Sequence, residues 1–153
     1  MSTTTKRDDP LLSFRFHAEI DGLLFAGFSD VSGLNVEIET ERYQEGGVNN
    51  YVHILPKNAK YQNIVLKKGI AYSSAMWDWM KDVAGGIIKQ RNGRIILMDY
   101  NGNEIWYWKF QNAYPVKWTG TDLSSTGDKP FIETMELAHT GIQMERSQYQ
   151  PTW

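Results

Sequence analysis

The sequence contains no cysteine among its 153 residues. This absence excludes disulfide scaffolds, thiolate metal sites and cysteine nucleophiles together. Long apolar runs are missing as well, because the run Ile-Ile-Leu-Met at residues 95–98 is far shorter than the roughly 20 residues that cross a bilayer. The first nine residues contain no apolar stretch typical of a secretory signal. We therefore expect a soluble protein that is made in the cytoplasm and does not insert into membranes.

An excess of charge of one sign is also missing, since 16 Lys and Arg stand against 18 Asp and Glu. A general basic field that would attract nucleic acid is thus not expected. What the sequence does have is 6 Trp, 8 Tyr and 6 Phe, beside a mean hydropathy of −0.48. So many rings in a polar chain indicate either alternating strands or a surface rich in interfaces. Composition alone leaves both explanations open.

Hydrophobic periodicity predicts a mainly β chain with one helix. Apolar and polar residues alternate over residues 12–20, and an Asp-Gly turn follows at 21–22. Apolar residues at helical spacing over 73–84, ended by Gly85-Gly86, predict the helix. Together with Asn-Gly turns at 92–93 and 101–102, the pattern indicates about seven to nine strands, mostly antiparallel. Besides 12–20, the expected strands are 23–28, 36–43, 59–66, 87–90, 94–100, 104–112, 116–119 and 131–139.

The length predicts a single domain over 1–153. Within it, residues 1–10 are expected to be a mobile N-terminal arm and residues 143–153 a polar C-terminal tail. Residues 44–58 show no clear period and predict a connection longer than a usual hairpin loop. This connection nevertheless carries four apolar side chains, those of Tyr51, Val52, Ile54 and Leu55. Since a solvated loop gains nothing from such side chains, we expect another chain to cover them.

A second unusual feature is a row of carboxylates on the expected strand 36–43. Glu37, Glu39 and Glu41 share one face of it, and such i, i+2 neighbours lie roughly 7 Å apart and repel one another. The opposite face, with Val36 and Ile38, suits a core. Two interpretations of the charged row remain open: cross-strand ion pairs on a solvated face, or a face that lines an aqueous channel or meets a neighbouring subunit. Basic residues follow the long connection, at Lys57, Lys60, Lys67 and Lys68.

No motif for catalysis or for a cofactor is recognisable. His17, His53 and His139 lie in separate segments without ligand or triad spacing. Gly85-Gly86 follows a helix instead of opening one, so it does not form a phosphate cradle. We therefore predict no catalytic residues, no metal site and no cofactor.

Several blocks of the sequence carry a family resemblance. They are residues 9–16 (DPLLSFRF), 27–34 (GFSDVSGL), 43–47 (YQEGG), 66–70 (LKKGI), 112–118 (NAYPVKW) and 132–141 (IETMELAHTG). In this order, from about residue 9 to 142, the chain resembles phage tail tube proteins. More specifically, it resembles the inner-tube subunits of contractile tails and of extracellular contractile injection systems.

The resemblance implies an antiparallel β-sandwich or barrel flanked by one α-helix. Six such subunits would close into a ring with a continuous barrel around a lumen, and rings would stack into a tube. The implied partners are a sheath protein, baseplate and spike proteins and a tube terminator, with protein cargo or DNA in the lumen. The tube would be part of a phage tail or a phage-tail-like particle, such as a tailocin, that can be released from the cell.

Roles for the unusual features follow from this resemblance as hypotheses. Glu37, Glu39 and Glu41 become candidate lumen-lining residues, and Tyr51, Val52, Ile54 and Leu55 a candidate inter-ring loop. Lys60, Lys67 and Lys68 become candidate inter-subunit charge partners. A monomeric β-barrel that binds a small ligand is the alternative function, and an enzyme with a dispersed site is a third.

Overall fold

The structure is a computed structural model that describes residues 15–21, 23–25, 28–44, 46–47, 52–69, 74–127 and 130–148, with backbone only at 23–25. The expected N-terminal arm and Tyr51 lie outside these residues. The described part contains one helix, α1 (Ala75–Ala84), and ten strands. The strands are β1 (Arg15–Ile20), β2 (Leu23–Phe25), β3 (Phe28–Ser32), β4 (Val36–Tyr43), β5 (His53–Tyr61), β6 (Ile64–Gly69), β7 (Arg91–Met98), β8 (Glu104–Gly120), β9 (Ile132–Ala138) and β10 (Gly141–Arg146).

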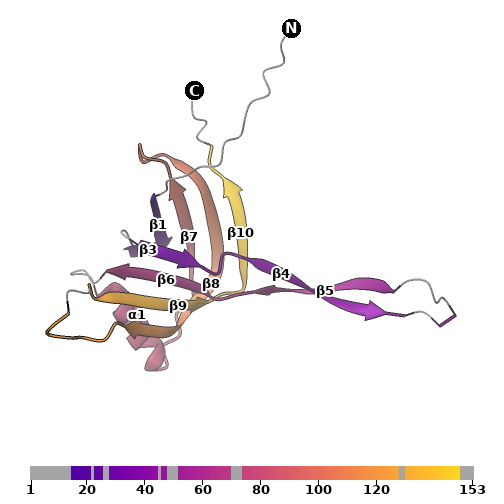
Figure 1. The fold of residues 1–153 in the computed structure, drawn as a ribbon, viewed down its shortest axis with the longest axis horizontal. Helices are drawn as coiled ribbons and strands as arrows, with labels where there is room; N and C mark the ends of the chain where they lie inside the picture. The colour runs from indigo at the N-terminus through magenta and orange to yellow at the C-terminus, as the bar shows by residue number, and fades with distance from the viewer. Residues whose placement is uncertain are drawn as a thin grey trace, which may run out of the picture.

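Eight strands form a continuous antiparallel sheet that folds over into two layers whose strands cross (Figure 1). The first layer contains β2, β1, β7, the first part of β8 and β10, and the second layer contains the second part of β8, β9, β6 and β3. Strand β8 joins the layers. Its bend is marked by a positive φ of 52° at Asn112 and by a register shift between Pro115 and Lys117. The expected antiparallel β-sandwich with one flanking helix is thus confirmed.

The core lies between the two layers. Strand β9 shows why, because Glu133, Met135 and Leu137 point inward while the residues between them are only partly covered. Ile95 and Phe110 of the first layer are 1% exposed and meet these side chains. Burying each large apolar side chain contributes about 1.5–3 kcal/mol, so this alternation decides which face of each strand turns inward.

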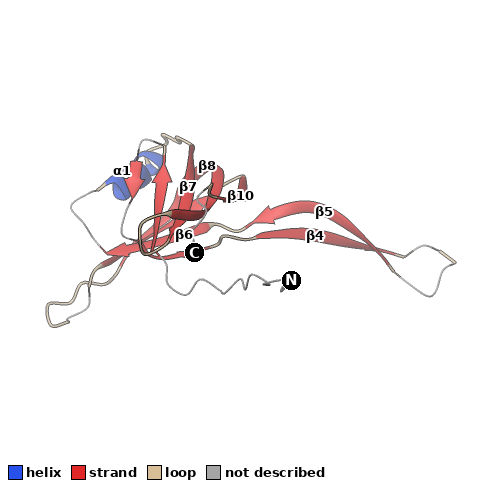
Figure 2. Cartoon of the chain, turned by 90° about the horizontal axis from the view of Figure 1, so that it is seen from above, coloured by secondary structure: helices blue, strands red, loops and turns tan. Residues whose placement is uncertain are grey.

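Helix α1 covers the open side of the core next to β8 (Figure 2). Met76 and Trp79 are its buried residues, spaced three apart on one face. The Trp79 indole Nε1 donates to the Lys89 carbonyl oxygen at 3.2 Å, which also fixes the chain that leads to β7. Beside it, Trp77 packs edge-on against Trp118 of β8, with ring centroids 4.9 Å apart.

Strands β4 and β5 form a separate two-stranded ribbon that projects away from the sandwich (Figures 1 and 2). Residues 44–58 were expected to be an irregular connection, and this expectation is wrong for the first part of β5, because residues 53–56 pair with β4 and residues 57–58 lie in the register shift of the same strand. The expected strand 59–66 is in fact divided at residues 62 and 63, where β5 ends and β6 enters the second layer. The apolar face of the expected strand 36–43 also differs from expectation: Val36 and Ile38 are 55% and 49% exposed and take no part in the core.

Three further expectations about strands are wrong. Residues 87–90 are irregular, because the Lys89 carbonyl is held by Trp79 of the helix. Residues 104–120 form one strand instead of two. Pro115 is accommodated because β7 stops pairing at Ala113, so the proline's missing N–H falls near an unpaired edge. Residues 141–146 form β10 on β8, so the expected tail from residue 143 begins inside a strand.

Candidate assembly surfaces

The ribbon of β4 and β5 has two chemically different faces. Directly opposed residues of an antiparallel pair point to the same side, so Ile38 shares a face with Ala59, and Arg42 with Ile54. The register places Glu37 opposite Lys60 and Glu41 opposite Leu55 on the other side. We call the first side the apolar face and the second the charged face. The apolar face comprises Val36, Ile38, Thr40, Arg42, Ile54, Pro56, Ala59 and Tyr61.

The charged face carries the predicted row of carboxylates. Lys57 Nζ lies 3.3 Å from Glu41 Oε2, and Lys60 forms an ion pair with Glu39. The hydrogen bond to Glu39 is the largest of the effects that raise the pKa of Lys60, and the charge of Glu37 adds to it. Cross-strand ion pairing, the first of the two interpretations, is therefore observed. The pairs offset most of the negative charge of the row, since two lysines face three glutamates.

The predicted inter-ring residues are exposed but do not share one face. Ile54 lies on the apolar face and is 62% exposed, whereas Leu55 lies on the charged face opposite Glu41 and is 50% exposed. Val52, just before β5, is exposed as well. Sequence reasoning missed Val36 and Ile38 as exposed apolar residues, because their alternation with glutamates is equally typical of a strand that buries one face.

The three lysines predicted as inter-subunit charge partners lie in different surroundings. Lys60 pairs with Glu39 of its own ribbon. Lys67 is exposed on β6, opposite Asp30 of β3. Lys68 is buried, and its Nζ lies 4.0 Å from Glu133 Oε2 of β9. The Trp118 indole donates to the other oxygen of that carboxylate at 2.9 Å, so Lys68 has its charge partner inside its own chain.

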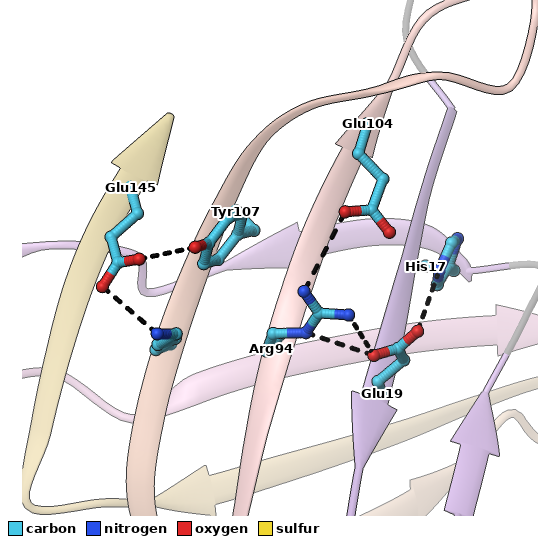
Figure 3. A network of polar contacts seen from close by, with 7 residues as sticks. His17, Glu19, Arg94, Glu104, Tyr107 and Glu145 are labelled. Atoms are coloured by element: carbon cyan, nitrogen blue, oxygen red, sulfur yellow. Dashed lines mark hydrogen bonds and ion pairs between the residues drawn. The ribbon is translucent and has the colours of Figure 1, made fainter. Parts of the chain in front are cut away.

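The outer face of the first layer carries a network of charged residues from four adjacent strands (Figure 3). Arg94 of β7 donates from Nε and Nη2 to Glu19 Oε2 of β1, at 3.1 and 2.5 Å, and its Nη1 lies 3.9 Å from Glu104 Oε2. The hydrogen bond to Glu19 is the main cause of the raised pKa of Arg94. The charge of Arg94 is thus paired with carboxylates of its own subunit.

Tyr107 and Glu145 continue the network onto β10. The phenol donates to Glu145 Oε2 at 2.5 Å, and Lys109 Nζ lies 3.3 Å from Glu145 Oε1. These two contacts lower the pKa of Glu145, and the carboxylate in turn raises the pKa of Tyr107. The pairs cross from strand to strand and therefore hold the edge strand β10 to β8.

The second layer leaves two strand edges unpaired in the described part of the chain. Strand β3 pairs with β6 alone, and residues 114–120 of β8 pair with β9 alone. The face of this layer that points away from the core carries Asp30, Lys67, Lys117 and Glu136, of which Glu136 accepts a hydrogen bond from Asn63 at 2.8 Å. It is a polar face with equal numbers of positive and negative charges.

The three histidines do not come together among the described residues. No group of three His, Asp or Glu side chains is placed to hold a metal ion within them. His17 of β1 contacts Glu19 at 3.9 Å, whereas His139 lies between β9 and β10, with its Nε2 at hydrogen-bond distance from the Gln62 carbonyl oxygen. No helix among the described residues is long and apolar enough to span a membrane.

Comparison with known proteins identifies the family to which the sequence is similar. The model of the family described as T4-like virus tail tube protein gp19 matches residues 12–143. A comparison with curated proteins found no match.

Solved structures share the fold at low sequence identity. A chain of the anti-feeding prophage baseplate aligns with a TM-score of 0.80 and 23% identity, over 94% of this chain and 100% of the other. A chain of the extended sheath–tube complex of the extracellular contractile injection system PVC aligns with a TM-score of 0.82 and 22% identity, over 95% and 100%. Hcp1 from Flavobacterium johnsoniae is more distant, with a TM-score of 0.55 and 16% identity over 90% and 99%.

Proposed function

The chain belongs to the family of T4-like virus tail tube protein gp19 and is a structural tube subunit, and from this premise we propose that six copies close into a ring and that rings stack through the projecting ribbon. The tube supplies a passage and involves no catalytic step. The alternative, a monomeric β-barrel that binds a small ligand, has no support from the family or from the fold.

The exposed apolar face of the ribbon is the observation that carries the proposal. Val36, Ile38 and Ile54 are each about half exposed or more, and they lie on the same face of a ribbon whose β4–β5 pair belongs to a sheet of its own, with the pair Thr40 and Pro56 between Ile38 and Ile54. An isolated two-stranded ribbon is marginally stable in water, and a contiguous apolar patch typically marks an interface. A neighbouring subunit that covers this face would supply the burial that the single chain lacks.

Within the inter-ring contact, we assign Ile54 and Val52 to the docked surface together with Val36 and Ile38. Leu55 belongs to the other side of the ribbon, where it would meet a second neighbour or the rim of the lumen. Tyr51 lies outside the described residues and remains a candidate from the sequence.

We propose that the ring closes through the edge strands of the second layer. Its four strands β3, β6, β9 and the second part of β8 alternate in direction, so β3 of one copy would lie antiparallel to β8 of the next. The first layer has five strands, β2 to β10, and its two edges would meet in parallel. Antiparallel pairs are more common and slightly more stable, which favours closure through β3 and residues 114–120. Closure would also remove these two free edges, which otherwise invite aggregation.

A barrel closed in this way would turn the outer face of the second layer toward the lumen. Lys67, predicted as a charge partner between subunits, would then be a lumen residue together with Asp30, Lys117 and Glu136. We also retain Glu37, Glu39 and Glu41 as lumen-lining candidates, because the charged face of the ribbon is ion-paired and suited to water. Such a wall is nearly neutral and would bind neither acidic nor basic cargo strongly.

The surrounding partners follow from the kind of assembly. We propose a sheath, a baseplate with a spike and a terminator as partners of the tube, and protein or DNA as its cargo, in a phage-tail-like particle assembled in the cytoplasm. Structural neighbours from a baseplate and from a sheath–tube complex support this context.

Electron microscopy of the purified protein tests stacking, and crosslinking tests the closing edges. Because the chain has no cysteine, Asp30→Cys with Thr119→Cys introduces the only two thiols. A flexible bismaleimide tolerates a register offset of a few residues, each about 3.3 Å. We expect a ladder of covalent species that ends at six. Rings that form but give no ladder would contradict closure through β3 and β8, while leaving the tube function intact.

A further inference from the structure

The ribbon joins the sandwich through a narrow root formed by residues 33–35 and 62–63, where both of its chains leave regular strand structure. Gly33 has a φ of +86°, and a Cβ at this position would lie 2.0 Å from the Asn63 carbonyl oxygen. The two chains therefore cross in close contact. The Asn35 side-chain amide donates to Gln62 Oε1 at 3.0 Å across this crossing.

A side chain from outside the ribbon holds this root. His139, in the turn between β9 and β10, lies with its Nε2 2.8 Å from the Gln62 carbonyl oxygen. Its ring also packs against Tyr61, the last residue of β5, with centroids 5.7 Å apart. Because a carbonyl oxygen only accepts, Nε2 carries the proton and donates it. His139 Nδ1 is buried and has no hydrogen-bond partner among the described residues, so a single bond and the ring contact account for the role of the side chain.

The turn that carries His139 is itself fixed to the sandwich. The Thr140 amide donates to the Gln111 carbonyl oxygen at 3.0 Å, and Thr140 Oγ1 accepts from the Asn112 side-chain amide at 3.0 Å. His139 thus connects β8, at the centre of the fold, with the base of the ribbon.

We propose that His139 is the positioning residue that sets the direction in which the ribbon leaves the sandwich. The eight residues of β4 span about 26 Å, so a swing of about 10° at the root moves the far end by about 5 Å. Such a displacement exceeds the tolerance of a packed side-chain contact. The consequence for stacking rests on the proposed tube function, whereas the positioning itself is a property of the single chain.

Distance measurements between two spin labels test this role in the unassembled chain. Asn58→Cys places one label on the ribbon and Lys81→Cys another on helix α1, both at exposed positions, and the absence of native cysteine leaves no background. We expect a narrow distance distribution in the parent. In His139→Ala the distribution should broaden by about 2 Å for every 10° of released swing, because Asn58 lies only about 13 Å from the root, nearer than the far end of the ribbon.

Two substitutions separate the parts of the interaction. His139→Phe keeps a ring against Tyr61 but loses the donor, so intermediate broadening is expected. His139→Gln restores a donor and should narrow the distribution relative to alanine. His17→Ala, on β1 of the first layer, is the matched control and should leave the distribution unchanged.

The outcomes distinguish the inference from a folding defect and from the tube proposal. A second label pair, Lys81→Cys with Asn101→Cys, lies within the sandwich and should stay narrow in every variant. An unchanged ribbon distribution in His139→Ala, with this second pair narrow, would overturn the positioning role. If the ribbon distribution broadens while assembly proceeds normally, the positioning role stands and ribbon docking is contradicted.

Discussion

The double substitution Ile38→Ser with Ile54→Ser should block stacking of rings without unfolding the subunit. Both side chains lie on the apolar face of the ribbon and are 49% and 62% exposed. Complete burial of an isoleucine contributes about 1.5–3 kcal/mol, so covering the exposed half should contribute about 1 kcal/mol for each residue. The pair is then worth about 2 kcal/mol for each docked ribbon, which corresponds to a roughly 30-fold weaker contact. Because the six ribbons of one ring dock together, the loss of affinity between two rings is larger than the loss at a single ribbon.

Sedimentation of assembled material over a series of protein concentrations measures this effect. We expect the concentration required for tube growth to rise by at least about the 30-fold of a single contact. The free energy of unfolding in urea should fall by no more than about 1–2 kcal/mol, because neither residue belongs to the core. Ile87→Ser with Ile88→Ser is the matched control, since these residues are 54% and 60% exposed but lie between α1 and β7. Tubes that grow at the parental concentration, or an equal loss in the control, would refute the assignment of the ribbon.

Three further predictions concern the subunit alone. Gly33→Ala should reduce the free energy of unfolding by at least about 2 kcal/mol in urea denaturation, because the added Cβ clashes with the Asn63 carbonyl and the backbone has positive φ. Glu133→Ala should lower the free energy of unfolding by about 3–5 kcal/mol in the same assay, because it removes the carboxylate that faces the buried Lys68. A combined Lys68→Met and Glu133→Leu variant should recover most of this loss. Asp99 accepts hydrogen bonds from the Asn101 and Asn103 amides, and those from Asn103 are the main reason that its folded pKa lies below 3.8. Its stabilising contribution is therefore present above that value and is lost as the pH falls through the folded pKa, so Asp99→Asn should flatten the acid limb of a plot of melting temperature against pH.

Local patterns predicted much of the fold. Strand β4 begins and ends at the predicted residues, because its alternation of apolar and acidic side chains is unbroken. Helix α1 was predicted within two residues at its start, with Gly85 at its end. The pattern did not show which of these apolar faces would be buried, since burial depends on the partner that tertiary structure brings to each face.

Other elements depend on pairing between distant segments and could not be read from local pattern. Strand β10 forms because β8 offers it an edge, although its own sequence alternates weakly. Pro115 looked like an interruption and is instead a part of β8, at a point where one neighbour is lost. Residues 53–58 of β5 were missed because the register of the β4–β5 pair shifts between Ile38 and Thr40, and this bulge disturbs the alternation of apolar and polar residues along β5.

The candidate assembly surfaces likewise combine features that the local sequence predicted with features that depend on distant segments. Ion pairing along the ribbon was one of two interpretations that the sequence allowed, and the Lys57–Glu41 pair is observed. The burial of Lys68 could not be predicted, because its partner Glu133 lies on β9, far along the chain. His139 appeared without a role, since its contact with Gln62 exists only after β9 is placed beside the root of the ribbon.

Cryo-electron microscopy of the purified protein tests the central claim most directly. The account predicts stacked six-membered rings around an open lumen, with the β4–β5 ribbon of each subunit in contact with a neighbouring subunit. A monodisperse monomer at the highest concentration that stays in solution, verified by sedimentation velocity, would contradict it.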